Sequence, residues 1–191
     1  MVLYVATKNQ GKIKEINKIM ERADIICKSF PDMEDVEETG NTFEENAKIK
    51  ADFLSSKLKD EYVIADDSGL SVDALNGAPG IYSARYSGTH GDDKANNIKI
   101  LKEMQGKKDR KCRFICSIAL SKNGKTVKTF HGELEGEVGY EERGENGFGY
   151  DSIFLLPNGK TTAEIEHNEK NKISHRYKAL EKLRDYLNKV I

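Results

Sequence analysis

Residues 112–137 read CRFICSIALSKNGKTVKTFHGELEGE, and this stretch decides the fold class. It contains two runs, Cys112–Ser121 and Lys125–Glu137, that are long enough to form extended strands. Between them lies Asn123-Gly124, the dipeptide most typical of a two-residue hairpin turn. The stretch therefore predicts two long antiparallel neighbours in the middle of the chain, which argue against a purely parallel doubly wound sheet.

Outward from this hairpin, apolar patterns predict short strands and helices in alternation. Strands are expected at Val2–Ala6, Ile25–Cys27, Tyr62–Ala65 and Ile153–Leu156. Helices are expected at Ile13–Met20 and at Asp92–Met104. A third helix follows the Thr42–Glu45 capping box, with an apolar stripe of Phe43, Ala47, Ala51, Leu54 and Leu58. A last helix begins at Ser174 and has a core face of Leu180, Leu183, Leu187 and Val190. Without linkers or repeats, this order predicts one α/β (mixed α+β) domain over residues 1–191, with a mixed sheet flanked by helices and two lobes.

Composition limits the classes of partner. The chain has 191 residues, with 31 Lys and Arg against 32 Asp and Glu, which leaves a net charge of -1. It lacks the bulk positive field of non-specific nucleic-acid binding, so a local cluster of cations must meet any anionic partner. No run approaches the roughly 20 apolar residues that cross a bilayer, and the first apolar run is too short for a secretory signal. We therefore expect a cytoplasmic protein that binds neither nucleic acid nor membrane.

The cysteines indicate a reducing compartment. Three of them, Cys27, Cys112 and Cys116, cannot all pair within one chain. Along a strand, Cys112 and Cys116 would lie about 13 Å apart, whereas a disulfide needs less than about 7 Å between Cα atoms. We expect reduced thiols in the core.

Four polar segments lie where a predicted strand meets a loop, the usual place for ligands in α/β proteins. The first, TKNQGK at residues 7–12, precedes a helix whose positive end and free N–H groups suit an anion, although an ordinary turn with a solvated Lys12 also explains it. The second is Lys50, at the edge of the Phe43–Leu58 stripe. Its ammonium either points into a cleft or reaches solvent past apolar neighbours, and its position alone favours solvent.

The third segment is acidic and comprises Glu37-Glu38 with Asp66-Asp67-Ser68-Gly69. Because side chains alternate along a strand, one of Asp66 and Asp67 can face a cleft while the other braces the loop. Mg²⁺ takes one or two carboxylates and completes its shell with water and phosphate oxygens. A solvated acidic loop remains the alternative, especially for Glu37 and Glu38.

The fourth segment combines residues 147–151 with Lys170 and Ser174-His175-Arg176. The glycines beside Phe148 leave its ring face open for stacking on a base. Arg176 points inward from the first turn of a helix and needs an anionic or carbonyl partner, supplied by protein or ligand. His175 is also explained as a capped surface histidine. Together the four segments suggest a nucleoside triphosphate with Mg²⁺.

Five motifs, in order, resemble those of the inosine triphosphate pyrophosphatase family, the dITP/XTP pyrophosphatases: TKNQGK, EETGNTFEENAKIKA, ADDSGLSVDALNGAPGIYSARYSG, GFGYDSIF and NEKNKISHR. The resemblance runs almost end to end. It implies an elongated mixed sheet, a substrate cleft between two lobes and a cytosolic homodimer. It also implies Mg²⁺-dependent hydrolysis of dITP, ITP and XTP to the monophosphate and pyrophosphate.

The resemblance also implies roles for individual residues. The resemblance implies that the phosphate-binding loop consists of Thr7, Lys8, Asn9, Gln10, Gly11 and Lys12. It also implies that Lys50 reaches the phosphates from a helix. Glu37 and Asp67 resemble the Mg²⁺ ligands, Asp67 also the proposed proton acceptor, and Ser68 a substrate contact. The base-binding set comprises Phe148, Gly149, Tyr150, Asp151, Lys170, His175 and Arg176. Two residues depart from the family pattern: Lys8 replaces a common glycine, and Ser152 replaces a common proline, which we expect to loosen the base loop.

The implied mechanism follows from charge. A water that Asp67 orients or deprotonates attacks the α-phosphorus, and pyrophosphate leaves. Donors from His175-Arg176 meet a 6-oxo purine but not the 6-amino group of adenine. Three alternative functions remain. The GFGYD and SHR motifs argue against a pyrimidine nucleotide pyrophosphatase, and Glu37, Asp67 and Lys12 argue against a purine nucleotide sensor without turnover. The net charge argues against a nucleic-acid-binding module.

Overall fold

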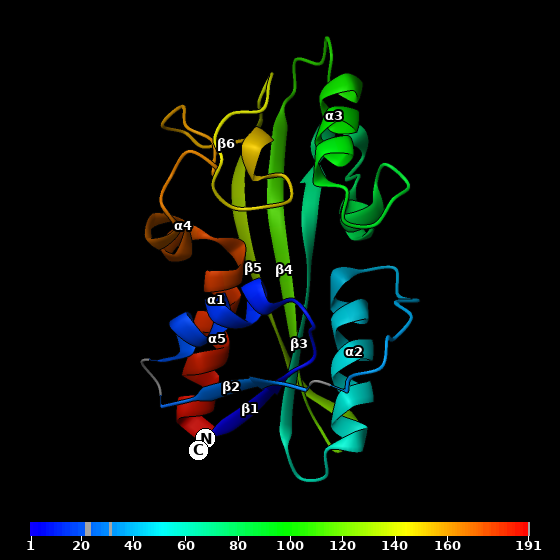
Figure 1. Ribbon diagram of the computed structural model, residues 1–191, viewed down its shortest axis with the longest axis vertical. Helices are drawn as coiled ribbons and strands as arrows, with labels where there is room; N and C mark the ends of the chain where they lie inside the picture. The colour runs from blue at the N-terminus through cyan, green and yellow to red at the C-terminus, as the bar shows by residue number, and fades with distance from the viewer. Residues whose placement is uncertain (22–23, 31, 191) are drawn as a thin grey trace. The chain divides into compact units, whose positions relative to one another are not determined.

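The computed structural model describes residues 1–21, 24–30 and 32–190 (Figure 1). Over these residues the strands form one six-stranded sheet in the order β2-β1-β3-β4-β5-β6. Their bounds are β1 Val2–Val5, β2 Ile26–Ser29, β3 Tyr62–Val72, β4 Lys111–Lys122, β5 Lys125–Val138 and β6 Phe154–Leu155. Strand β1 pairs in parallel with β2 and with β3, whereas β5 and β6 are antiparallel. The predicted mixed sheet is confirmed.

Five α-helices accompany the sheet in the described part of the chain. They are α1 Gln10–Met20, α2 Phe43–Lys57, α3 Asp93–Glu103, α4 His167–Ile173 and α5 His175–Val190. Short 3-10 turns occur at Asp73–Leu75, Gly80–Arg85 and Asp151–Ile153. Helix α4 was not predicted, because seven residues are too few to establish a 3.6-residue apolar pattern. No helix among the described residues has the length and apolar character that a membrane span requires.

The chain divides into two compact units. The first unit comprises Met1–Asp67, Cys116–Gly132 and Arg176–Ile191, and the second comprises Ser68–Ile115 and Glu133–His175. Strands β3, β4 and β5 each contribute residues to both units. The substrate cleft between two lobes stays a prediction.

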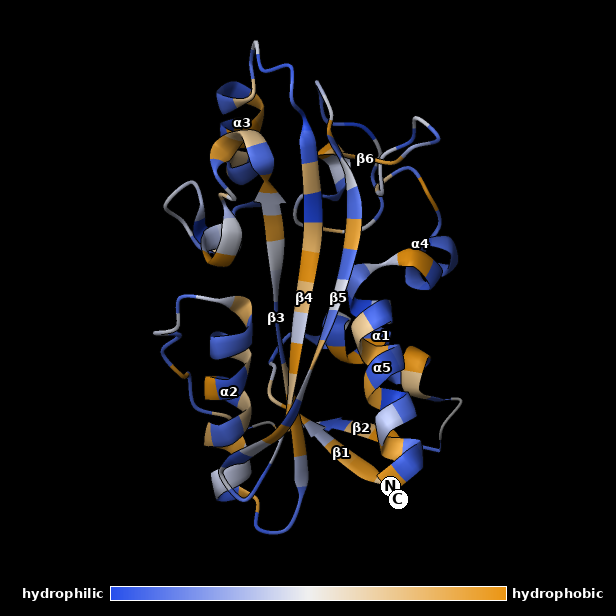
Figure 2. Cartoon of the chain, turned by 180° about the vertical axis from the view of Figure 1, so that it is seen from behind, coloured by the Kyte–Doolittle hydropathy of each residue, from blue (hydrophilic) through white to orange (hydrophobic). Residues whose placement is uncertain are grey.

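The first unit has a core between short strands and two amphipathic helices. Figure 2 shows β1 as an almost continuous apolar strand. In α5, Leu180, Leu183 and Leu187 are fully buried, as their spacing predicts. Val190 was placed wrongly on this face: it is 53% exposed, because it lies in the last turn of α5, beyond the residues that the core covers.

Helix α2 begins as its capping box predicts. The Thr42 hydroxyl accepts a hydrogen bond from the N–H of Glu45 (3.1 Å), and the Glu45 carboxylate accepts one from the N–H of Asn41 (2.6 Å). Ala47 and Ala51 are completely buried and pack in one cluster with alanine and valine of β3. Small residues on this face therefore let helix and sheet approach closely.

The second unit is built around stacked rings. Phe114 of β4 stacks on Phe154 at 4.2 Å between centroids, and on His175 at 4.9 Å. A Cβ on Gly136 would lie 2.5 Å from the Phe154 ring, so only glycine leaves room for that ring on β5.

The prediction that the strand from Tyr62 ends at Ala65 is wrong, because β3 continues to Val72. The polar run Asp66–Gly69 hides the strand pattern. Cationic partners for both carboxylates allow this run to stay extended in a partly buried position. Gly69 is required within it, since a Cβ there would lie 2.4 Å from the Ser83 hydroxyl.

Two smaller predictions are confirmed. The hairpin turn has φ of 52° at Asn123 and 79° at Gly124, the left-handed pair that this dipeptide favours. All three cysteines are buried free thiols.

Candidate functional site

The loop after β1 is closed by Asn9, which caps α1. Its side-chain oxygen accepts hydrogen bonds from the N–H groups of Gly11 (2.9 Å) and Lys12 (3.2 Å), and its own N–H donates to the Thr7 hydroxyl (3.2 Å). Two of the helix N–H groups that were expected to face an anion are therefore already satisfied. Lys8, in the same loop, pairs with the exposed Asp35 (2.8 Å).

Asp66 is the acidic centre of the first unit. It is 5% exposed and accepts from the ammonium of Lys12 (3.4 Å) and from the guanidinium of Arg176 (3.3 and 3.4 Å). Burial alone would raise the pKa of Asp66, but the charges of Lys12, Arg176 and Lys50 outweigh burial and hold this pKa well below its usual range. Side-chain alternation along the strand predicts that one of Asp66 and Asp67 braces the loop. The contacts with Lys12 and Arg176 show that this residue is Asp66.

Arg176 has partners inside the protein. Besides Asp66, its guanidinium donates to Glu15 of α1 at 2.8 Å, and the residue is 2% exposed. The prediction that Arg176 points inward is confirmed. Asp66 and Glu15 of the chain itself provide anionic partners for it. Its contact with a base stays a prediction.

The Lys50 ammonium binds acceptors of the protein while its side chain keeps 15% exposure, so the interpretation drawn from its helix position, that it reaches out to solvent, is wrong. Its ammonium donates to the backbone carbonyl of Asp66 (2.6 Å) and pairs with Glu38 (3.0 Å). It also lies 3.9 Å from Asp67. Burial lowers the pKa of Lys50, but these three acidic residues outweigh burial and raise it above the ordinary value. The helical stripe gives no sign of these partners, because they come from other segments.

Asp67 carries an unused acceptor. Its Oδ2 is buried and has no hydrogen-bond partner among the residues that the structure describes. Burial raises the pKa of Asp67 to about 6, with Glu38 and Asp66 adding to the effect and with Lys50 and a hydrogen bond from the Asn46 side chain opposing it. A buried, unpaired carboxylate oxygen is costly unless a ligand satisfies it.

The donor set fits a hard cation that keeps most of its shell for water and phosphate. Among the described residues there is no group of three or more His, Cys, Asp or Glu placed to hold a metal. Mg²⁺ needs only one or two protein carboxylates, which the free Oδ2 of Asp67 and one neighbour can provide. Glu38 and Asp67 both pair with the Lys50 ammonium, whereas Glu37 is exposed. Glu37 as a ligand stays a prediction.

These side chains form what we call the charge cluster of the first unit. It consists of Lys12, Glu15, Glu38, Lys50, Asp66, Asp67 and Arg176. The sequence analysis includes Asp66 and Glu38 in the acidic segment but does not identify the cations that they bind. It misses Glu15, because nothing in the helical pattern of residues 13–20 relates this residue to Arg176.

The second unit carries the residues of the predicted base-binding set up to His175. Phe148 is 53% exposed and lies in residues 146–152, the Phe148 loop, with the Lys170 ammonium 5.0 Å from its ring centroid. Asp151 is buried and accepts from Lys170, from the N–H of Phe148 (3.0 Å) and from the Thr162 hydroxyl (2.8 Å). Asp151 therefore braces the loop from within.

Other members of that set are also held internally. The Tyr150 hydroxyl donates to the carbonyl of Ser83 (2.6 Å), and burial raises the Tyr150 pKa far above its usual value. His175 is 9% exposed and stacked on Phe114, so it is not a surface histidine. Ser68 is half-buried on β3. Of this set, Phe148 presents a large exposed surface.

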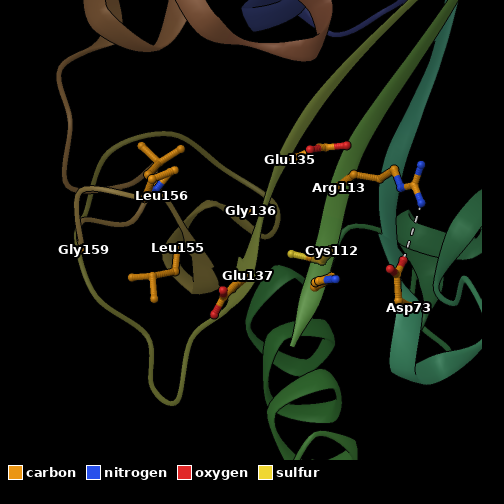
Figure 3. Close-up of a pocket in the computed structure, with 11 residues that line it drawn as sticks. Asp73, Cys112, Arg113, Glu135, Gly136, Glu137, Leu155, Leu156 and Gly159 are labelled. Atoms are coloured by element: carbon orange, nitrogen blue, oxygen red, sulfur yellow. Dashed lines mark ion pairs between the residues drawn. The ribbon is translucent and has the colours of Figure 1, made fainter. Parts of the chain in front are cut away.

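A separate hollow of about 560 Å³ lies in the second unit (Figure 3). Charged side chains of both signs line it, and two of them, Arg113 and Asp73, pair with each other at 3.6 Å. None of the predicted site residues lines this hollow.

Comparison with known proteins gives one consistent result. A family model described as the Ham1 family matches residues 3–186. The dITP/XTP pyrophosphatase of Bacillus licheniformis is 50% identical over 187 residues, covering 95% of each chain, and that of Bacillus subtilis is 50% identical over 185 residues, covering 94% of this chain and 93% of its own. The structure of the Staphylococcus aureus Ham1 protein matches with a TM-score of 0.88 at 44% identity over 98% of both chains, and a HAM1 protein from Coxiella burnetii with a TM-score of 0.92 at 39% identity over the whole of both chains. The similarity spans both units.

Proposed function

Because the chain belongs to the Ham1 family, we propose that it is a nucleoside triphosphate pyrophosphatase for non-canonical purine nucleotides. Its substrates would be dITP or ITP and XTP or dXTP, and its products the monophosphate and pyrophosphate. The observation that carries the proposal is the Asp67 carboxylate, whose Oδ2 has no partner among the described residues and whose Oδ1 lies 3.9 Å from the Lys50 ammonium. This pairing offers a hydrogen-bond acceptor and a fixed cation at one place.

The charge balance of the first-unit cluster supports a requirement for a divalent cation. The cluster holds three cations and four carboxylates, so its own charge does not favour a triphosphate tail. Mg²⁺ held by Asp67 and an acidic neighbour, Glu37 or Glu38, would supply the missing positive charge and withdraw electron density from the phosphates. Lys12 and Lys50 would then bind the phosphate oxygens as fixed cations.

The chain's own residues divide the remaining work. Asp67 orients or deprotonates the attacking water. Lys50 is held by Asp66 and Glu38, so its ammonium is already in place and needs no reorganisation during the reaction. Asp66 fixes Lys12 and Arg176, which makes it a positioning residue and not a catalytic one.

Phe148 supplies the base-binding surface in this proposal. Its exposed ring would stack on the purine, an interaction of about 1–3 kcal/mol in single-strand nucleic-acid binders. His175 and Arg176 would provide donors for the 6-oxo group, which adenine lacks. Acting on free nucleotides as a homodimer in the cytoplasm, such an enzyme would cleanse the nucleotide pool.

A product analysis tests the proposal. The protein is incubated with Mg²⁺ and separately with dITP, XTP, dGTP, dTTP and ATP, and the nucleotide and phosphate products are resolved. We expect monophosphate and pyrophosphate from dITP and XTP, with little from the others. Diphosphate with orthophosphate would place the attack at the γ-phosphorus and refute the mechanism, while tight dITP binding without turnover would favour a nucleotide sensor.

A further inference from the structure

In the second unit, helix α3 holds the Phe148 loop at its backbone. Asp93 accepts a hydrogen bond from the N–H of Gly149 (2.9 Å), and the side-chain amide of Asn97 donates to the carbonyl of the same glycine (3.0 Å). Both polar groups of the residue after Phe148 are therefore fixed by one helix. With φ of +60°, Gly149 also has a backbone that other residues rarely adopt.

Asn97 extends this attachment to a second point on the loop. It is 3% exposed, and its Nδ2 also lies 3.3 Å from the Ser152 hydroxyl and 3.2 Å from Glu142. Ser152 in turn donates to the same Glu142 oxygen (3.2 Å). Because all three neighbours of Nδ2 are acceptors, the amide has one workable orientation, even though Oδ1 is left without a partner among the described residues.

Ser152 therefore does the opposite of what its departure from the family pattern suggests. Its hydroxyl joins the loop to Asn97 and Glu142, which a proline at this position has no donor to do. On the other side of the loop, Asp151 accepts from Phe148 N–H and Lys170. The backbone is thus tied on both sides of the exposed Phe148 ring.

We propose that Asn97, Ser152 and Glu142 are positioning residues that set where Phe148 meets the purine. The proposal rests on the proposed function, in which Phe148 stacks on the base. These residues act through Phe148 and touch no reacting atom, so their loss weakens nucleotide binding and leaves the chemical step unchanged.

Asn97→Ala, compared with Asn96→Ala, tests the proposal. The two asparagines are adjacent on α3 and similarly buried, but among the described residues the Asn96 side chain bonds to residues 83–87 and not to the Phe148 loop. Hydrogen exchange measured by mass spectrometry on a peptide covering the Phe148 loop reports the attachment without any substrate. We expect exchange there to be about tenfold faster in Asn97→Ala and unchanged in Asn96→Ala.

Steady-state kinetics with dITP and Mg²⁺ then separates positioning from general damage. We expect KM to rise about fivefold in Asn97→Ala with kcat within about twofold, and neither to change in Asn96→Ala beyond that margin. Unchanged exchange in Asn97→Ala refutes the attachment, and faster exchange with an unchanged KM refutes its role in binding. If the wild type does not hydrolyse dITP, the proposed function fails while the exchange result still decides the attachment.

Ser152 provides the second variant pair. Ser152→Ala removes the hydroxyl, whereas Ser152→Thr keeps it, so we expect a raised KM and faster loop exchange only in Ser152→Ala. In the Asn97→Ala, Ser152→Ala double variant, the combined effect on KM and on loop exchange should be smaller than the sum of the two single effects, because both changes break the same set of hydrogen bonds. Full additivity would show that Ser152 acts independently of Asn97.

Discussion

Asp66 and Asp67 are neighbours with identical side chains, and their surroundings move their pKa values in opposite directions. Burial acts on both, but Asp66 has Lys12, Arg176 and Lys50 around it and keeps a low pKa. Asp67 has less compensation, and burial raises its pKa to about 6. The sequence could not predict which of the two aspartates braces the structure and which one is free to act, because the cations that bind Asp66 come from distant segments, one of them from Arg176.

Asp67→Asn tests this division at the catalytic residue. The amide keeps the size of the side chain but removes its charge and its basicity, so we expect turnover of dITP to be lost while nucleotide binding stays largely intact. Turnover is measured by pyrophosphate release and binding by calorimetry. Loss of binding to the same degree as turnover would contradict the assignment.

Arg176→Ala addresses the buried ion pairs. Removing the guanidinium takes from the buried Asp66 one of its two ion-pair partners, with Lys12 remaining, and takes from Glu15 its 2.8 Å partner, which should lower the free energy of unfolding by about 3–5 kcal/mol. The matched control is Arg184→Ala on the same helix, whose partners Glu181 and Asp185 are exposed and whose loss should cost about 0–1 kcal/mol. Urea unfolding measures both, and equal losses would be inconsistent with a structural role for the Asp66 pair.

The same Arg176→Ala variant tests base recognition. If Arg176 donates to the 6-oxo group as well as to Asp66, affinity for ITP should fall much more than affinity for ATP. Calorimetric titration of both nucleotides, at a temperature where the variant is folded, gives the ratio. Equal losses would leave Arg176 with its internal partners alone.

At the scale of elements, turns and caps were predicted with residue accuracy where one local interaction determines them. Thr42 and the Asn123-Gly124 turn are examples, since each depends on hydrogen bonds or dihedral angles within four residues. The end of β3 was not, because its polar stretch is stabilised by distant cations. Local patterns carry no information on such partners.

Gly124→Ala tests how much the hairpin turn contributes. Gly124 has φ of +79°, and a Cβ there would lie 3.3 Å from the side chain of Ser56. We expect a loss of about 1–2 kcal/mol in the free energy of unfolding from the left-handed conformation and this contact. Gly159→Ala is the control for conformation alone, since Gly159 has φ of +83° and nothing within 4 Å. A loss no larger than that of Gly159→Ala would show that the contact with Ser56 does not matter.

At the scale of the whole molecule, the sequence predicted the mixed sheet, the helices with long apolar stripes and the buried cysteines. It did not predict the contacts that define the site, such as Lys50 with Glu38, because these join segments that no periodicity relates. Metal binding, base contacts and the dimer stay predictions.

The thiols report on the integrity of the whole fold. Burial raises the pKa of Cys27, Cys112 and Cys116 to about 12 each. At pH 8 each is therefore protonated, and we expect native protein to react with a thiol reagent far more slowly than a free thiol. In denaturant all three should react at once. One cysteine reacting rapidly in the native state would show that part of the fold opens easily.

The chain crosses between its two units four times, and this order limits how it can be made. A ribosome that has released residues 1–175 has delivered every segment of the second unit. The first unit is still missing α5, and with it three fully buried leucines and the guanidinium that pairs with Asp66. The apolar surfaces of β1 and α1 therefore stay partly uncovered in the nascent chain until α5 has been synthesised. A chain that stops before α5 lacks the helix that covers these apolar surfaces, so loss of this helix alone should prevent the first unit from folding.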